Sequence, residues 1–80
     1  MYKNKAGNRN NICGARVREL RLALPEKTSQ RKLADKLQLA HLDLDKNAIQ
    51  RIESGGRFVT DIELKALAEI LGVTPNDLLL

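Results

Sequence analysis

The chain has 80 residues and a mass of 9.0 kDa, which predicts one small domain and leaves no room for a second. No apolar run approaches the roughly 20 residues that a membrane span needs, and the N-terminus lacks the apolar core of a signal peptide. One cysteine and one histidine exclude an internal disulfide and a closed zinc site, so we expect a cytoplasmic domain without metal or cofactor.

The net charge of +4 is unevenly distributed along the chain. Residues 1–32 carry nine cations and two anions, whereas the remaining residues carry five cations and eight anions. A basic field confined to one part of a chain suits a polyanion such as nucleic acid. Charge alone does not identify the partner, because small basic proteins are common. Aromatic residues make up only 2%, so stacking on single-stranded bases is not expected.

Residues 1–11 are polar, rich in Asn and Lys, and without hydrophobic periodicity. This composition predicts a flexible basic arm in front of a folded domain at residues 12–80. The arm either reaches a DNA groove or is simply disordered.

Two helices are predicted between residues 12 and 37. The first, with Asn11 as N-cap and Pro25 as its stop, turns four apolar side chains to one face: Cys13, Val17, Leu20 and Leu24. On that face Cys13 is expected to be a buried, unreactive thiol. The second begins after the N-cap Ser29 and places three side chains inside: Leu33, Ala34 and Leu37. Its first turn is basic, which opposes the helix dipole unless a phosphate binds there.

Residues 38–44 fit neither the helical nor the strand period, and we expect one more helical turn followed by a loop. His41 in this stretch is interpreted as a solvated loop histidine rather than a ligand or a pH switch. Residues 45–54 are predicted to form a third helix that is capped by Asp43 or Asp45 and ended by two glycines. Its inward residues are Ile49 and Ile52.

The last part of the chain is predicted to hold a fourth helix and a final short turn. Thr60 and Glu63 form a capping box at the start of the fourth helix. Two apolar stripes predict burial on two sides: Leu64, Leu67, Ala68 and Leu71 in one, Ile62, Ala66 and Ile70 in the other. Thr74 caps the final turn, with Pro75 at its first position. Since no segment has the pattern of a strand, the predicted fold is an all-α, compact five-helix bundle.

The third helix combines a buried face with a polar, hydrogen-bonding face. A helix that enters the DNA major groove needs this division, because its inner side must be anchored while its outer side meets base edges. Arg and Lys pair with guanine, and Asn and Gln pair with adenine. The candidate base-reading residues are Lys46, Asn47, Gln50 and Arg51. The alternative is that these side chains form an ordinary solvated face.

Three motifs taken together carry a resemblance to a known family: Ser29-Gln30-x-x-Leu33-Ala34, Ile49-x-x-Ile52-Glu53-x-Gly55, and Leu64-x-x-Leu67-Ala68-x-x-Leu71-Gly72-Val73. From about Ile12 onward the chain resembles the helix-turn-helix domain of phage repressors and Cro, the xenobiotic-response-element family. The resemblance implies a lambda-repressor-like fold, binding to double-stranded DNA, transcription regulation as a repressor, and pairing into a homodimer. The chain departs from the pattern between its second and third helices, where the connection is longer by about five residues.

The resemblance also assigns roles to individual residues. Lys46, Asn47 and Arg51 match the base-reading positions, with Gln50 at their edge. The phosphate-contacting positions lie at the start of the second helix and after the third, and they correspond to Gln30, Arg31, Ser54, Gly55 and Arg57. The start of the second helix could also be ordinary surface. Arg21 and Glu53 match a structural ion pair that ties the first helix to the third.

Two further functions compete with DNA regulation. An antitoxin with this fold would bind a toxin protein through the apolar C-terminus or through the leucines of the long connection, Leu39, Leu42 and Leu44. The final leucines, residues 78–80, are either core or a dimer face, and the chain could also be part of a longer protein. An enzyme is not expected, because no carboxylate pair, activated nucleophile or phosphate-binding glycine loop is present, and so no small-molecule substrate is assigned.

Overall fold

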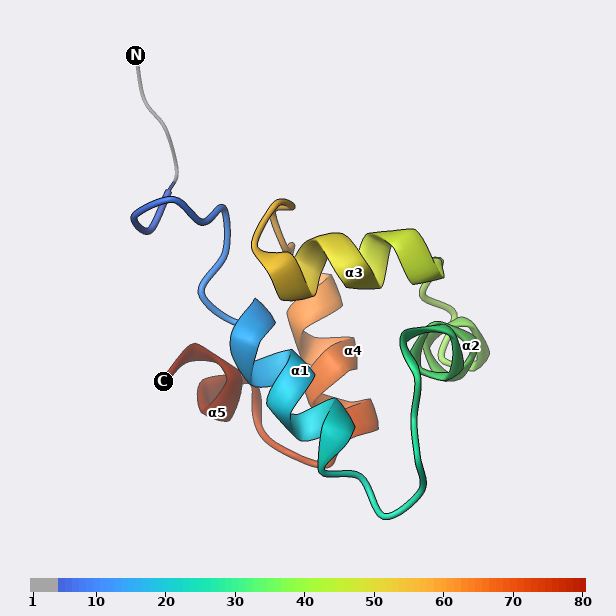
Figure 1. Cartoon of the computed structure of the whole chain (residues 1–80). Helices are drawn as coiled ribbons and strands as arrows, with labels where there is room; N and C mark the ends of the chain where they lie inside the picture. The colour runs from blue at the N-terminus through green and yellow to red at the C-terminus, as the bar shows by residue number, and fades with distance from the viewer. Residues whose placement is uncertain (1–4) are drawn as a thin grey trace.

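The computed structural model describes residues 5–80, and all of its regular structure is helical (Figure 1). Five helices follow one another along the chain: α1 (Gly14–Leu22), α2 (Gln30–Leu39), α3 (Lys46–Ser54), α4 (Asp61–Leu71) and α5 (Pro75–Leu79). Apart from one isolated bridge between Ala6 and Arg9, no β pairing occurs within residues 5–80. The all-α prediction of five helices is therefore confirmed. In the same residues, no helix has the length and apolar character to cross a membrane.

Most helices begin where the sequence supplies a hydrogen-bond acceptor. Ser29 and Asp45 accept from the backbone N–H groups three residues ahead, and so open α2 and α3. Thr60 and Thr74 form complete capping boxes at the starts of α4 and α5. These four predicted starts are confirmed, and the choice between Asp43 and Asp45 falls on Asp45.

The first helix is shorter than predicted. It begins at Gly14 rather than Ile12 and ends at Leu22, before Pro25 is reached. Asn11 still supplies the N-terminal acceptor, because its Oδ1 takes the Gly14 N–H at 2.9 Å, but it does so from outside the helix. This is the bond that an N-cap makes to the N–H three residues ahead, but the regular helix starts only after Cys13, which has no side-chain cap bond of its own.

The core lies where α1 and α2 pack against α3 and α4, and α5 covers α4. Seven large side chains are fully buried there: Val17, Leu33, Leu37, Ile49, Ile52, Leu67 and Leu78. The prediction of a second buried stripe on α4 is wrong for Ile62, which is 70% exposed. Ile62 lies in the first turn of α4, where none of the other described helices covers it.

Helix α2 extends to Leu39, and the connection to α3 begins with a residue in the left-handed conformation, His41, that terminates the helix. His41 has a φ of 65°, and its N–H donates to Gln38 O while the N–H of Leu42 donates to Leu37 O, both at 2.9 Å. This is the Schellman pattern, in which glycine usually takes the left-handed position. Beyond it, Leu44 is buried in the core. Residues 40–44 thus form a loop that is anchored by these hydrogen bonds and by Leu44.

Candidate nucleic-acid interface

One side of α3 is free of contact with the rest of the domain. Figure 1 shows α3 at the edge of the bundle, with α1 and α4 together on its other side. Ile49 and Ile52 are fully buried on the inner side. The four candidate base-reading residues are all exposed: Lys46, Asn47, Gln50 and Arg51. Since residues four apart in a helix share a face, these side chains form one polar surface of donors and acceptors.

The start of α2 contributes a second group of polar side chains. Arg31 is exposed, and Gln30 is half-buried. Gln30 Nε2 donates to Glu53 Oε1 at 3.1 Å, so this amide is held against α3. The second hydrogen on Gln30 Nε2 is available to another acceptor.

Arg21 and Glu53, the two residues paired by the resemblance, form a buried bidentate ion pair. Arg21 Nε lies 2.7 Å from Glu53 Oε2, and Nη2 lies 2.9 Å from Oε1. The remaining Nη1 donates to Thr28 O at 3.0 Å. The hydrogen bond with Glu53 raises the pKa of the Arg21 guanidinium. This pair joins α1, α3 and the segment that enters α2.

Arg57 has a partner that the sequence analysis missed. Its guanidinium is bidentate on Glu63, with both N–O distances 2.9 Å. The same carboxylate accepts from the Thr60 N–H at 3.0 Å, as the capping box requires. These hydrogen bonds, that from Arg57 first, lower the pKa of Glu63. The capping box predicted the contact with Thr60, but no local rule pairs residues six apart across a turn.

The turn after α3 contains the other two residues assigned to a phosphate. Ser54 is exposed, and its hydroxyl donates to Arg51 O at 3.2 Å. Gly55 ends the helix in the left-handed conformation, with a φ of 85°. Its carbonyl oxygen accepts from the Asn10 N–H at 2.8 Å. The turn is thus held by the N-terminal segment of the chain.

Residues 9–11 pack against the C-terminal end of α3, although the sequence predicted a flexible arm as far as residue 11. Arg9 Nη2 donates to Glu53 O at 2.9 Å. Asn11 Nδ2 donates to Ile52 O at 3.1 Å and to Arg57 O at 2.7 Å. The side chains of residues 9–11 thus contact carbonyls more than 40 positions away, on the domain that the arm was expected to precede. Residues 1–4 of the predicted arm lie outside the described residues, and the flexibility of the arm stays a prediction. An Asn-rich sequence carries no local signal for such partners.

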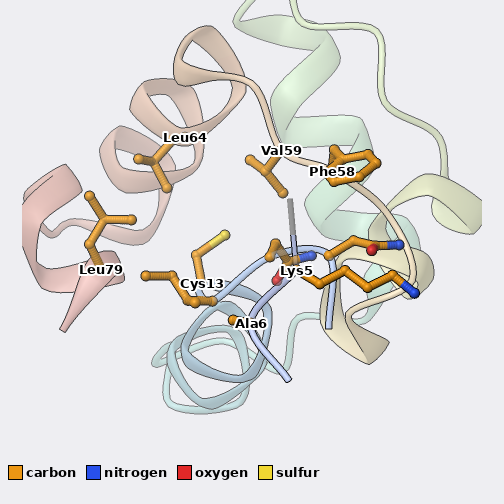
Figure 2. Close-up of a pocket in the computed structure, with 10 residues that line it drawn as sticks. Lys5, Ala6, Cys13, Phe58, Val59, Leu64 and Leu79 are labelled. Carbon is orange, nitrogen blue, oxygen red and sulfur yellow. The ribbon is translucent and has the colours of Figure 1, made fainter. Parts of the chain in front are cut away.

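A mostly apolar cavity of about 420 Å³ lies between the N-terminal segment, residues 58–59 and the helices α4 and α5. In Figure 2, Leu64 and Leu79 line one side of it, and Val59 and Phe58 line another. Cys13 also lines the cavity but is only 2% exposed, and burial raises the pKa of its thiol. The thiol is therefore in its protonated, less nucleophilic form near neutral pH.

The comparisons with known proteins gave one match. A family model described as "Helix-turn-helix" matches residues 17–78, which is more than half of the chain and spans α2, α3 and α4 completely. Neither the curated proteins nor the solved structures include one that matches this chain.

Proposed function

We propose a specific function for this chain, which belongs to the helix-turn-helix family of DNA-binding regulators, of the phage repressor and Cro type. The proposal is that it binds a specific sequence of double-stranded DNA, with α3 in the major groove. The family is one of DNA-binding proteins rather than of enzymes. The observation that carries the proposal is the division of α3. Its isoleucines are fully buried, while its four polar side chains are all exposed.

The base-reading assignment follows the chemistry of the exposed face. Lys46 and Asn47 stand in the first turn of α3, at the end that enters the groove. Arg51 lies one turn further along, where its guanidinium suits the two acceptors of a guanine. Gln50, beside it, suits an adenine at the edge of the contact.

Backbone contacts would flank the base-reading face on two sides. Gln30 and Arg31 would meet a phosphate at the start of α2, where unpaired N–H groups and the helix dipole favour an anion. Ser54 and Arg57 would meet a second phosphate beyond α3. Since Glu63 already neutralises Arg57, we expect Arg57 to contribute less charge there than an unpaired arginine.

We expect the regulator to act as a homodimer and a repressor. Three apolar side chains at the mouth of the cavity are about half exposed: Ile12 (54%), Phe58 (56%) and Leu79 (45%). Leu80 is 90% exposed at the end of the chain, whereas Leu78 is fully buried in the core. A patch of this kind can pair with its own copy around a two-fold axis, which would place two half-sites about 34 Å apart.

Selection of bound sequences from random duplex DNA tests the proposal. Salt at about 150 mM damps non-specific attraction to phosphates. A palindromic motif would support both specific reading and the dimer, and its spacing would give the dimer geometry. A single motif without symmetry would support specific reading and contradict the dimer. Enrichment of no motif would contradict base reading by α3.

An antitoxin that binds a toxin protein is the second candidate. The feature that favours it is Leu39, which is 84% exposed at the end of α2. Of the other two leucines of the connection, Leu44 is buried and Leu42 is half-buried, so a toxin would meet mainly Leu39. A gene for a toxin-like protein beside this one is the discriminating observation, and its absence would demote this candidate.

A further inference from the structure

The segment Arg9–Asn11 binds the end of α3 more completely than a passing contact would. Of the six consecutive carbonyl oxygens from Ile52 to Arg57, all but that of Ser54 accept a hydrogen bond from this segment. Asn10 contributes two of these bonds, from its backbone N–H to Gly55 O and from its Nδ2 to Gly56 O. Ile52 O and Glu53 O belong to the last turn of α3 and the other three acceptors lie just beyond it, so the segment acts as an external cap in addition to Gly55.

Two glycines make room for this cap. A Cβ atom at Gly14 would collide with Ile52 O, so only glycine lets α1 approach the end of α3 this closely. A Cβ atom at Gly55 would lie 2.7 Å from Arg9 Cζ, in the space that the arginine side chain occupies. The absence of a side chain at Gly14 and Gly55 therefore leaves the space in which Arg9 and Asn11 reach the turn after α3.

The cap also fixes which way the peptide groups of the turn point. In a trans peptide the C=O and the following N–H point in opposite directions, and no cis bond occurs among the described residues. Because Asn10 and Asn11 hold the carbonyls of Gly56 and Arg57, the N–H groups of Arg57 and Phe58 are directed away from the cap. Within residues 5–80 neither N–H has an acceptor.

We propose that Asn10 and Asn11 are positioning residues, which orient the turn at residues 54–58 so that its free N–H groups meet a phosphate of bound DNA. This inference rests on the proposed function. It assigns a part in DNA binding to neutral side chains that need not touch the DNA.

The test uses Asn10→Ala and Asn11→Ala in the full chain, with duplexes that carry a methylphosphonate, which is uncharged, at one phosphate at a time. In the wild type, the neutral substitution at the phosphate facing the turn weakens binding severalfold. In the two variants this weakening disappears at that phosphate and persists at the others. Leu71→Ala is the matched control, because Leu71 is buried at the opposite end of α4 and its loss lowers stability without touching the turn.

Each outcome decides between the alternatives. If the folded variants keep the wild-type pattern at every phosphate, the positioning role is wrong. A uniform loss of affinity in the variants, equal to that of Leu71→Ala at the same thermal stability, would also overturn it. If Asn11→Ala does not fold, Asn10→Ala decides alone, because it removes one side-chain bond and leaves the backbone bond. A wild type that binds no duplex DNA would refute the proposed function instead.

Discussion

The guanidinium of Arg21 and the carboxylate of Glu53 form a bidentate ion pair between α1 and α3, with side chains that are only 9% and 3% exposed. Glu53 also accepts from Gln30, so one buried carboxylate links three helices. A buried charge that loses its partner has no compensation from water. The pair therefore holds α3 in place, and removing either partner leaves the other as a buried, unpaired charge.

Arg21→Ala should lower the free energy of unfolding by about 3–5 kcal/mol, because Glu53 is left charged and buried. Urea denaturation followed by circular dichroism measures the loss. Arg16→Ala is the matched control, since the Arg16–Glu19 pair is exposed and such pairs contribute about 0–1 kcal/mol. Equal losses in the two variants would show that burial adds nothing to the Arg21–Glu53 pair.

Arg51→Ala should weaken binding to the selected duplex by about 1–3 kcal/mol and relax the preference at one base pair. The reason is the loss of a guanidinium that suits the two acceptors of a guanine. Fluorescence anisotropy on the selected duplex and on its single-base variants measures both effects. Lys65→Ala, which removes a cation from an exposed position on α4, controls for net charge. The assignment of Arg51 fails if both variants bind the selected duplex equally well.

His41→Gly should stabilise the domain by about 1 kcal/mol, since glycine adopts the left-handed conformation without the steric cost that a Cβ atom brings. Thermal and urea unfolding give the change. His41→Ala separates the backbone effect from the imidazole, because alanine keeps the Cβ atom at a φ of 65°. A gain of the same size with alanine would mean that the imidazole, and not the backbone, is unfavourable.

The free energy of unfolding should decrease at acidic pH, partly because Glu63 becomes protonated. Its pKa in the folded protein is lowered below the ordinary value of 4.5, mainly by the hydrogen bond from Arg57. A carboxyl group whose pKa is lowered by folding stabilises the folded state fully at pH values above its pKa in the unfolded chain. This stabilisation is lost as the pH falls through its pKa in the folded protein. Glu63→Gln should therefore be less stable than the wild type near pH 7, and the difference should shrink as the pH falls below about 4.5.

Urea unfolding of both proteins between about pH 7 and pH 3 tests this dependence. Asp61→Asn, in the same first turn of α4 but exposed, should show a smaller change over the same range. A constant difference between the wild type and Glu63→Gln across the whole range would contradict the role given to the ion pair with Arg57.

The features that the sequence predicted are those set by neighbours within one or two turns. Ser29, Asp45, Thr60 and Thr74 each accept from an N–H three residues ahead, and such caps depend on local residues alone. The exposed face of α3 likewise follows from helical periodicity. The two hydrogen bonds from Asn11 Nδ2 lie beyond such rules, because their acceptors Ile52 O and Arg57 O are more than 40 positions away. Ile62 fits the helical period but lies at an end of α4 that nothing among the described residues covers.

The polar anchors of α3 are concentrated at its C-terminal end, and this has a consequence for how the chain tolerates changes of length. Arg9, Asn11 and Arg21 all bind the last turn of α3 or the carbonyls just beyond it. The connection that precedes the N-terminal end of α3 contacts the core chiefly through Leu44. Insertions or deletions before Leu44 can thus be absorbed as a larger or smaller loop, without changing the direction of the helix. The resemblance places the additional residues of this chain in that stretch, so we expect the direction of α3 to be the same with a shorter connection.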